Sequence, residues 1–291
     1  MTKDLSKFSG FIYGTISSAS FGLIPLFAIP ILNAGMGFIS TLLYRFIIAT
    51  FFLAFILLLK KESFKISRTD VIPLIILSLL YLASSTFLLW GYLYMPGGIA
   101  TTIHFMYPVI TTLIMMLFFR ERKSLARIFA IAMAVMGVFF LSKTDTDNSI
   151  SIIGIAIVLL SAVAYASYLV AVGQLRTNKI KGLKLTFYVF FLGSIFLLAG
   201  MLTTGSIETT TDTSIFANLI LLALIPTIVS NLTLIEAIKR IGSTQTSVLG
   251  AMEPVTAVAV GIIAFGDTIT VPICIGIILI ISAVTIIILK R

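Results

Sequence analysis

Apolar runs of about 18 to 24 residues recur along the whole chain, and they limit the possible folds more than any other feature. Since a helix rises about 1.5 Å per residue, each run can cross the roughly 30 Å hydrocarbon core of a bilayer. We expect ten membrane-spanning helices, at about 8–30, 36–59, 71–94, 98–119, 125–142, 150–172, 184–205, 216–237, 244–265 and 271–289. Barrel strands would need alternating segments of about ten residues, so the predicted fold class is an all-α integral membrane protein.

The composition agrees with a membrane protein and disfavours soluble classes. Of the 291 residues, 59% are hydrophobic and 11% are charged, whereas about 25% of the residues in soluble domains are charged. The net charge of +9 is explained by loops, where Lys and Arg of membrane proteins gather, and we expect no nucleic-acid partner. The single cysteine, Cys274, provides neither a disulfide framework nor a cysteine-based metal site. We expect no metal and no cofactor.

The charges of the loops predict the orientation. With the N-terminus inside, the cytoplasmic segments hold 18 of the 20 Lys and Arg residues, and the outer loops hold Lys143 against five carboxylates. The remaining cation, Arg45, lies inside a helix. This alternation favours ten spans with both termini in the cytoplasm. The expected location is the inner or plasma membrane, as a multi-pass protein.

Two sets of five spans would form inverted repeats, because the second set enters the membrane from the opposite side. A shift of 146 residues sets Met106, Pro108 and Glu121 on Met252, Pro254 and Asp267. We therefore expect two five-helix repeats, at 1–148 and 149–291. Tyr107 stands where the second repeat has Glu253, so the repeats differ at this point.

Glu253 is the residue that most requires an explanation. In a helix that begins at about Thr244, it lies roughly 15 Å from the start and close to the bilayer midplane. A carboxylate there costs about 2.5 to 3.5 kcal/mol on insertion scales, so we interpret Glu253 as a coupling or gating group that can exchange a proton. The alternative is a structural acid that is hydrogen-bonded between helices.

Two prolines add to this interpretation. Pro254 cannot donate to the carbonyl of Gly250, and we expect that oxygen to be open to water, a side chain or a ligand. Pro108 weakens the matching helix of the first repeat in the same way, beside His104. We assign Glu253, Pro254 and Pro108 to coupling or gating.

Around these residues the chain resembles the EamA-type permeases of the drug/metabolite transporter superfamily, over nearly its whole length. The resemblance rests on the segment MEPVTAVAVGIIAFGDTIT with the apolar run after it, on its diluted first-half version MYPVITTLIMMLFFRERKS, and on Tyr44-Arg45-Phe46. It implies a secondary carrier, often an exporter, of amino acids or other small metabolites. It also implies a central cavity lined by helices one, three, four, six, eight and nine.

Polar and aromatic residues within the spans are the candidates for this cavity: Tyr81, Ser85, His104, Tyr165 and Asn231. Ordinary packing contacts and the interfacial aromatic belt are the alternatives. Arg45, about 13 Å into its helix, is interpreted as a structural anchor that pairs with an acid or carbonyl near the outer face. Binding of a substrate carboxylate is the alternative role of Arg45.

The preferred function is a secondary transporter of small organic metabolites that works by alternating access, and the hypothesis for coupling is that protons act through Glu253. An uncoupled facilitator and a lipid-carrier flippase remain alternatives, although a flippase would need more intramembrane cations than Arg45. An enzyme is disfavoured, because the chain has no paired acids, no nucleophile with a base, no metal cluster and no phosphate-binding glycine loop. The expected partners are a small-molecule substrate, protons and the lipid bilayer. We expect a monomer, with a dimer as the alternative.

Overall fold

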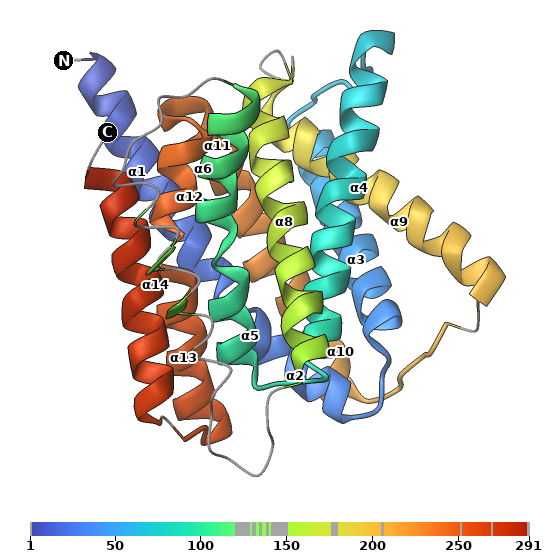
Figure 1. The fold of residues 1–291 in the computed structure, drawn as a ribbon. Helices are drawn as coiled ribbons and strands as arrows, with labels where there is room; N and C mark the ends of the chain where they lie inside the picture. The colour runs from blue at the N-terminus through green and yellow to red at the C-terminus, as the bar shows by residue number, and fades with distance from the viewer. Residues whose placement is uncertain are drawn as a thin grey trace.

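Helices are the only regular secondary structure in the described part of the computed structural model (Figure 1). The described residues are 2–119, 129, 132–133, 136–137, 140, 151–175, 180–204, 207–250, 252–268 and 270–289. The helices are α1 (Thr2–Phe21), α2 (Ile24–Asn33), α3 (Phe38–Leu59), α4 (Arg68–Gly91), α5 (Gly97–His104), α6 (Tyr107–Phe118), α8 (Ile152–Gln174), α9 (Gly182–Thr204), α10 (Thr213–Ala223), the π-helix η2 (Leu224–Val229), α11 (Ser230–Ile241), α12 (Ser243–Leu249), α13 (Met252–Phe265) and α14 (Val271–Leu289).

Eight segments of the described chain are long and apolar enough to cross a membrane. They are Phe8–Asn33, Phe38–Leu59, Arg68–Gly91, Gly97–Phe118, Ile152–Gln174, Gly182–Met201, Thr213–Ile241 and Ser243–Phe265, and each starts within three residues of an expected span. The expected helix at 271–289 coincides with α14. The expected helix at 125–142 falls outside the described residues, apart from a few isolated positions.

Four of these segments are interrupted part-way along, where continuous helices were expected. The interruptions lie between α1 and α2, between α5 and α6, between α12 and α13, and at η2. Each interruption contains or precedes a proline, at Pro25, Pro108, Pro254 and Pro226 respectively. Proline lacks the N–H that a continuing helix needs, and its ring crowds the preceding turn. The sequence therefore creates breaks inside the bundle and not only at its ends.

Helices from the two halves of the chain pack against each other throughout the bundle. Helix α1 packs along α11, α4 along α8, α3 along α9, and α5 against α13. The start of α1 and the end of α14 lie at the same end of the bundle (Figure 1). At the other end, the Glu208 carboxylate accepts a hydrogen bond from the Gly37 N–H at the start of α3, and the Glu208 N–H donates to Ser40 Oγ at 3.2 Å.

Candidate functional site

A buried hydrogen bond joins the two residues that a 146-residue shift sets on each other. The Tyr107 hydroxyl donates to Glu253 Oε1 at 2.8 Å, and both residues are 2% exposed. Tyr107 is the first residue of α6 and Glu253 the second of α13, so both lie at helix breaks. A methyl group at Gly250 would overlap the Tyr107 hydroxyl oxygen. Only a glycine at position 250 leaves room for this bond.

The break between α12 and α13 has a different hydrogen-bond pattern from the one expected. The Gly250 carbonyl accepts the N–H of Glu253 at 2.8 Å, so it is not left for a ligand by Pro254. The chain makes a tight turn here before α13 begins. Gly22, in the break between α1 and α2, packs against the backbone of Glu253, because a Cβ on Gly22 would lie 2.6 Å from the Glu253 carbonyl oxygen. Three helix breaks therefore meet at Glu253.

Four rings form a compact aromatic cluster beside this carboxyl. The Tyr165 ring meets the Tyr107 ring edge-on, with centroids 4.7 Å apart. His104, the last residue of α5, lies 5.2 Å from Tyr165 and 5.5 Å from Tyr107. Phe21, the last residue of α1, stacks on Tyr165 at 5.4 Å. The rings offer flat apolar surfaces next to the carboxyl group.

The hydrogen bonds of His104 decide which of its ring nitrogens carries the proton in the neutral form. Ser161 Oγ donates its hydrogen to the Ser84 carbonyl at 2.7 Å, and the same Oγ lies 3.0 Å from His104 Nδ1. Since Ser161 has already used its hydrogen, Nδ1 is the donor and Nε2 is an acceptor. His104 Nε2 has no hydrogen-bond partner among the described residues. The histidine therefore presents a lone pair to the cluster.

Arg45 organises a second group of polar residues. It is 0% exposed; its Nε donates to Thr227 Oγ1 at 2.5 Å, and its Nη2 lies 3.5 Å from the Tyr81 hydroxyl. Asn231 Nδ2 donates to the same hydroxyl at 2.8 Å. Thr227 lies in η2, where it donates to the Leu222 carbonyl at 2.7 Å. The π-turn therefore orients Thr227 toward Arg45.

The partner expected for Arg45 differs from the one observed. An acid or carbonyl near the outer face was expected, but the described contacts of its guanidinium are hydroxyl groups. No carboxylate in the described ranges lies within ion-pair distance of Arg45. Its Nη1 has no partner in that part of the chain either. A buried guanidinium with an unused N–H can bind an anionic group.

Helix α8 links the two groups. Tyr168 lies one turn after Tyr165, and their rings stack with centroids 6.1 Å apart. The Tyr168 ring meets the Tyr81 ring edge-on at 5.2 Å. Tyr165 contacts the Tyr107 ring at one end of this row, and the Tyr81 hydroxyl lies 3.5 Å from Arg45 Nη2 at the other. One continuous layer of buried rings therefore extends from the carboxyl to the guanidinium.

Several polar atoms in this layer lack partners within the described chain. They are Arg45 Nη1, His104 Nε2, Tyr168 OH, Asn231 Oδ1 and Glu253 Oε2. Each unsatisfied buried group costs about 1 to 3 kcal/mol, so such groups are usually paired. Their concentration in one place indicates a site for a polar solute or for water. No group of His, Cys, Asp and Glu in the described residues could hold a metal ion.

The structure brings together most of the residues singled out in the sequence. Tyr81, His104, Tyr165, Asn231 and Glu253 all belong to the central layer. Ser85 is buried on α4, one turn from Tyr81. Pro108 and Pro254 lie in the first turns of α6 and α13, at the breaks.

Sequence reasoning did not assign four residues of the layer to the site: Phe21, Tyr107, Tyr168 and Thr227. The 146-residue shift could have identified Tyr107, because it stands at the position of Glu253. The spacing of Tyr165 and Tyr168 on one helix was a signal for the second tyrosine. Nothing local in the sequence pointed to Phe21.

Comparison with known proteins places the chain among transporters. The model of the EamA-like transporter family matches residues 8–143 and again residues 152–289. An uncharacterized transporter of Archaeoglobus fulgidus is 26% identical over 209 residues, which are 70% of this chain and 72% of the relative. A solved crystal structure superposes with a TM-score of 0.68 at 16% identity and covers 96% of each chain. That structure therefore shares the fold.

Proposed function

Because the chain belongs to the EamA-like transporter family, we propose that it is a secondary transporter of small organic metabolites that works by alternating access. The buried layer between Glu253 and Arg45 is the observation that supports this function most directly. Both halves of the chain contribute to the layer, and it lies where three helices break and a fourth contains the π-helix η2. Half-helices that can tilt about such breaks would let each side of the site open in turn.

The unpaired atoms define the class of solute. Arg45 Nη1 can donate to a carboxylate, while Glu253 Oε2 can accept from an ammonium group. The rings of Tyr81, Tyr165 and Tyr168 lie between these two polar ends and suit an apolar side chain. An amino acid whose ammonium group lies at the far end of an apolar chain or ring from its carboxylate offers all three features. The family resemblance supports export as the direction.

Glu253 is the proposed coupling residue. Its Oε1 is held by Tyr107, and its Oε2 has no partner among the described residues, so one oxygen is available to a proton or to the ammonium of a solute. Competition between the two for the same oxygen would link proton movement to solute movement. An uncoupled facilitator would not need a proton and the solute to compete for Glu253.

We also propose that the chain crosses the membrane ten times, in two inverted repeats at 1–148 and 149–291. Both termini then lie in the cytoplasm. The family model that matches twice supports the repeats. The start of α1 and the end of α14 at one end of the bundle support an even number of crossings. The inner or plasma membrane is the proposed location.

Counterflow in liposomes tests the function. Vesicles with the purified protein are loaded with one unlabelled amino acid at a time and then exposed to the labelled compound. We expect exchange of at least one amino acid above the rate of empty vesicles, and uphill accumulation when a pH gradient is imposed. Failure of every amino acid would refute the zwitterion assignment.

Glu253→Gln separates coupling from transport in the same vesicles. The variant should lose accumulation driven by the pH gradient and should keep counterflow. If Glu253→Gln accumulates solute as the unmodified protein does, Glu253 is not the coupling residue. If the unmodified protein shows counterflow without any effect of the gradient, it is a facilitator.

A further inference from the structure

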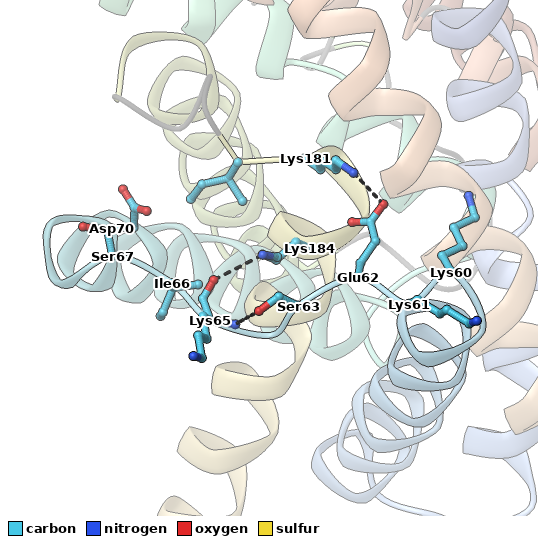
Figure 2. Close-up of a pocket in the computed structure, with 11 residues that line it drawn as sticks. Lys60, Lys61, Glu62, Ser63, Lys65, Ile66, Ser67, Asp70, Lys181 and Lys184 are labelled. Atoms are coloured by element: carbon cyan, nitrogen blue, oxygen red, sulfur yellow. Dashed lines mark hydrogen bonds and ion pairs between the residues drawn. The ribbon is translucent and has the colours of Figure 1, made fainter.

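A basic pocket of about 490 Å³ lies far from the central layer, where α3 ends and α9 begins (Figure 2). Its lysines come from two segments that are distant in sequence: Lys60, Lys61, Lys65, Lys181 and Lys184. Two carboxylates, Glu62 and Asp70, also line it. The excess of positive charge makes the pocket a site for an anion.

Contacts with α9 hold the loop between α3 and α4 in place. The Tyr188 hydroxyl donates to the Phe64 carbonyl at 2.5 Å, and the Phe64 ring packs edge-on against Phe187, with centroids 5.3 Å apart. Lys184 Nζ donates to the Lys65 carbonyl at 3.2 Å, as Figure 2 shows. The pocket is therefore formed before a ligand arrives.

The acids in the pocket leave most of its lysines without an ion-pair partner in the described ranges. Glu62 pairs with Lys181 at 3.0 Å across the pocket (Figure 2). No carboxylate in the described ranges lies within ion-pair distance of Lys60, Lys61 or Lys65. Helices α4 and α9 both begin at the pocket, and the N–H groups of their first turns add to the positive potential.

The backbone of Lys61 provides a second, independent observation. Helix α3 ends in a Schellman motif, in which the Glu62 N–H bonds to the Leu57 carbonyl and the Lys61 N–H to the Leu58 carbonyl. The motif requires a left-handed residue, and Lys61 has φ 51°. Glycine is the usual residue at this position, because a side chain there is strained. A lysine in place of glycine adds positive charge to the pocket at the expense of stability.

The surroundings of the pocket indicate the source of the anion. The last turns of α3 and the first turn of α4 expose large apolar side chains: Phe55 (52%), Leu58 (63%), Leu59 (66%) and Ile72 (68%). In a membrane, such side chains contact acyl chains, and the lysines that follow them lie at the level of the headgroups. Basic pockets between helices at the cytoplasmic surface bind anionic headgroups.

We propose that the pocket between the α3–α4 loop and the start of α9 binds the phosphate group of an anionic phospholipid. Lys60, Lys61 and Lys65 supply the free ammonium groups, while Lys181 and Lys184 fix the loop. The lipid would hold the start of α9 against the end of α3. This inference is independent of the central site and of its solute.

Lipid titration of the full chain in a non-ionic detergent tests the proposal. Phosphatidylglycerol, phosphatidylcholine and inorganic phosphate are added separately, and binding is followed by native mass spectrometry and by thermal unfolding. We expect bound phosphatidylglycerol and a raised unfolding temperature, with little effect of phosphatidylcholine. Equal binding of both lipids would overturn the proposal. If inorganic phosphate binds as tightly as phosphatidylglycerol, the ligand of the pocket is free phosphate and not a lipid headgroup.

Three variants sharpen the test. Lys60→Gln and Lys65→Gln should each weaken phosphatidylglycerol binding by about fivefold, since a lysine near an anionic surface contributes about that much. Lys61→Gly should weaken binding to a similar degree, yet raise the unfolding temperature of the lipid-free protein by about 2 to 4 °C. This opposite effect on binding and stability distinguishes loss of the site from misfolding.

Arg68→Gln is the matched control. Arg68 is an exposed cation of the same region, three residues after Lys65, and it does not line the pocket. It should lose no more than about twofold in phosphatidylglycerol binding. If Arg68→Gln weakens binding as much as Lys65→Gln, the attraction is a general property of the charged surface, and the pocket is not a specific site.

Discussion

The Tyr107 hydroxyl donates to the Glu253 carboxylate at 2.8 Å, and the two residues are 146 positions apart. The same shift aligns the two halves of the sequence around Pro108 and Pro254. The central contact of the bundle is therefore made between corresponding positions of the two halves. It joins the break between α5 and α6 to the break between α12 and α13.

Removal of the Tyr107 hydroxyl should destabilise the protein. In Tyr107→Phe, both oxygens of the buried Glu253 carboxyl lack described partners, which costs about 1 to 3 kcal/mol. Tyr168→Phe is the matched control, because the Tyr168 hydroxyl has no partner among the described residues, and removal of an unsatisfied buried group should leave stability unchanged or raise it. Unfolding in mixed detergent micelles measures both. Equal losses in the two variants would contradict the role of the Tyr107 bond.

Gly250→Ala should displace Tyr107 from Glu253. The added methyl group overlaps the tyrosine hydroxyl, and such overpacking costs about 1 to 3 kcal/mol. In the double variant with Tyr107→Phe the closest overlap, with the tyrosine hydroxyl, is gone, while the Ser247 carbonyl oxygen still lies 2.7 Å from the added methyl group, so the two losses should add only in part. Gly200→Ala on α9 is the control, because a Cβ there meets no atom of the described residues within 4 Å. Additive losses in the double variant would show that Gly250 acts elsewhere.

Arg45→Gln should selectively impair solutes that carry a carboxylate. The substitution removes the buried positive charge and the unpaired Nη1, so the KM of such a solute should rise tenfold or more, equal to about 1.4 kcal/mol. Counterflow with an amino acid and with its amide or ester compares charged and neutral forms. A KM that rises equally for both would assign Arg45 a structural role.

A pH-dependent stability is expected from Asp267, in the turn after α13. Burial raises the pKa of Asp267, so its ionised form is disfavoured in the folded state. Protonation of Asp267 therefore favours the folded state. This contribution to the free energy of unfolding is complete below the pKa of the unfolded chain, about 3.9, and is lost as the pH rises through the folded pKa. Asp267→Asn should therefore be the more stable protein at pH 7, by less than about 1 kcal/mol. The difference should vanish near pH 3.5, and a constant difference between these pH values would contradict this.

The positions of the spans could be predicted from the sequence because the bilayer sets the length of each apolar run. The breaks could not be predicted with the same ease. Pro108 and Pro254 were recognised as removing a hydrogen bond, whereas the structure ends one helix and begins another at each of them. A proline alone does not distinguish a kink from a break, since the packing of neighbouring helices decides which forms.

Single polar residues of the candidate site could be singled out from the sequence, but their arrangement could not. Glu253, His104 and Arg45 were recognised because polar groups are costly in a membrane. Their partners Tyr107, Ser161 and Thr227 come from other helices. Such pairings depend on which faces of the helices meet, and helices that are apolar on all sides contain little information about their facing sides.

The bond between Tyr107 and Glu253 also bears on how such a bundle could have originated. In a symmetric dimer of one five-helix chain, a residue on the twofold axis would meet only its own copy. Two glutamates would repel each other there, and two tyrosines would provide no acid. A tyrosine opposite a glutamate requires that the two copies be encoded separately. Gene duplication would thus have been a precondition for a single central acid.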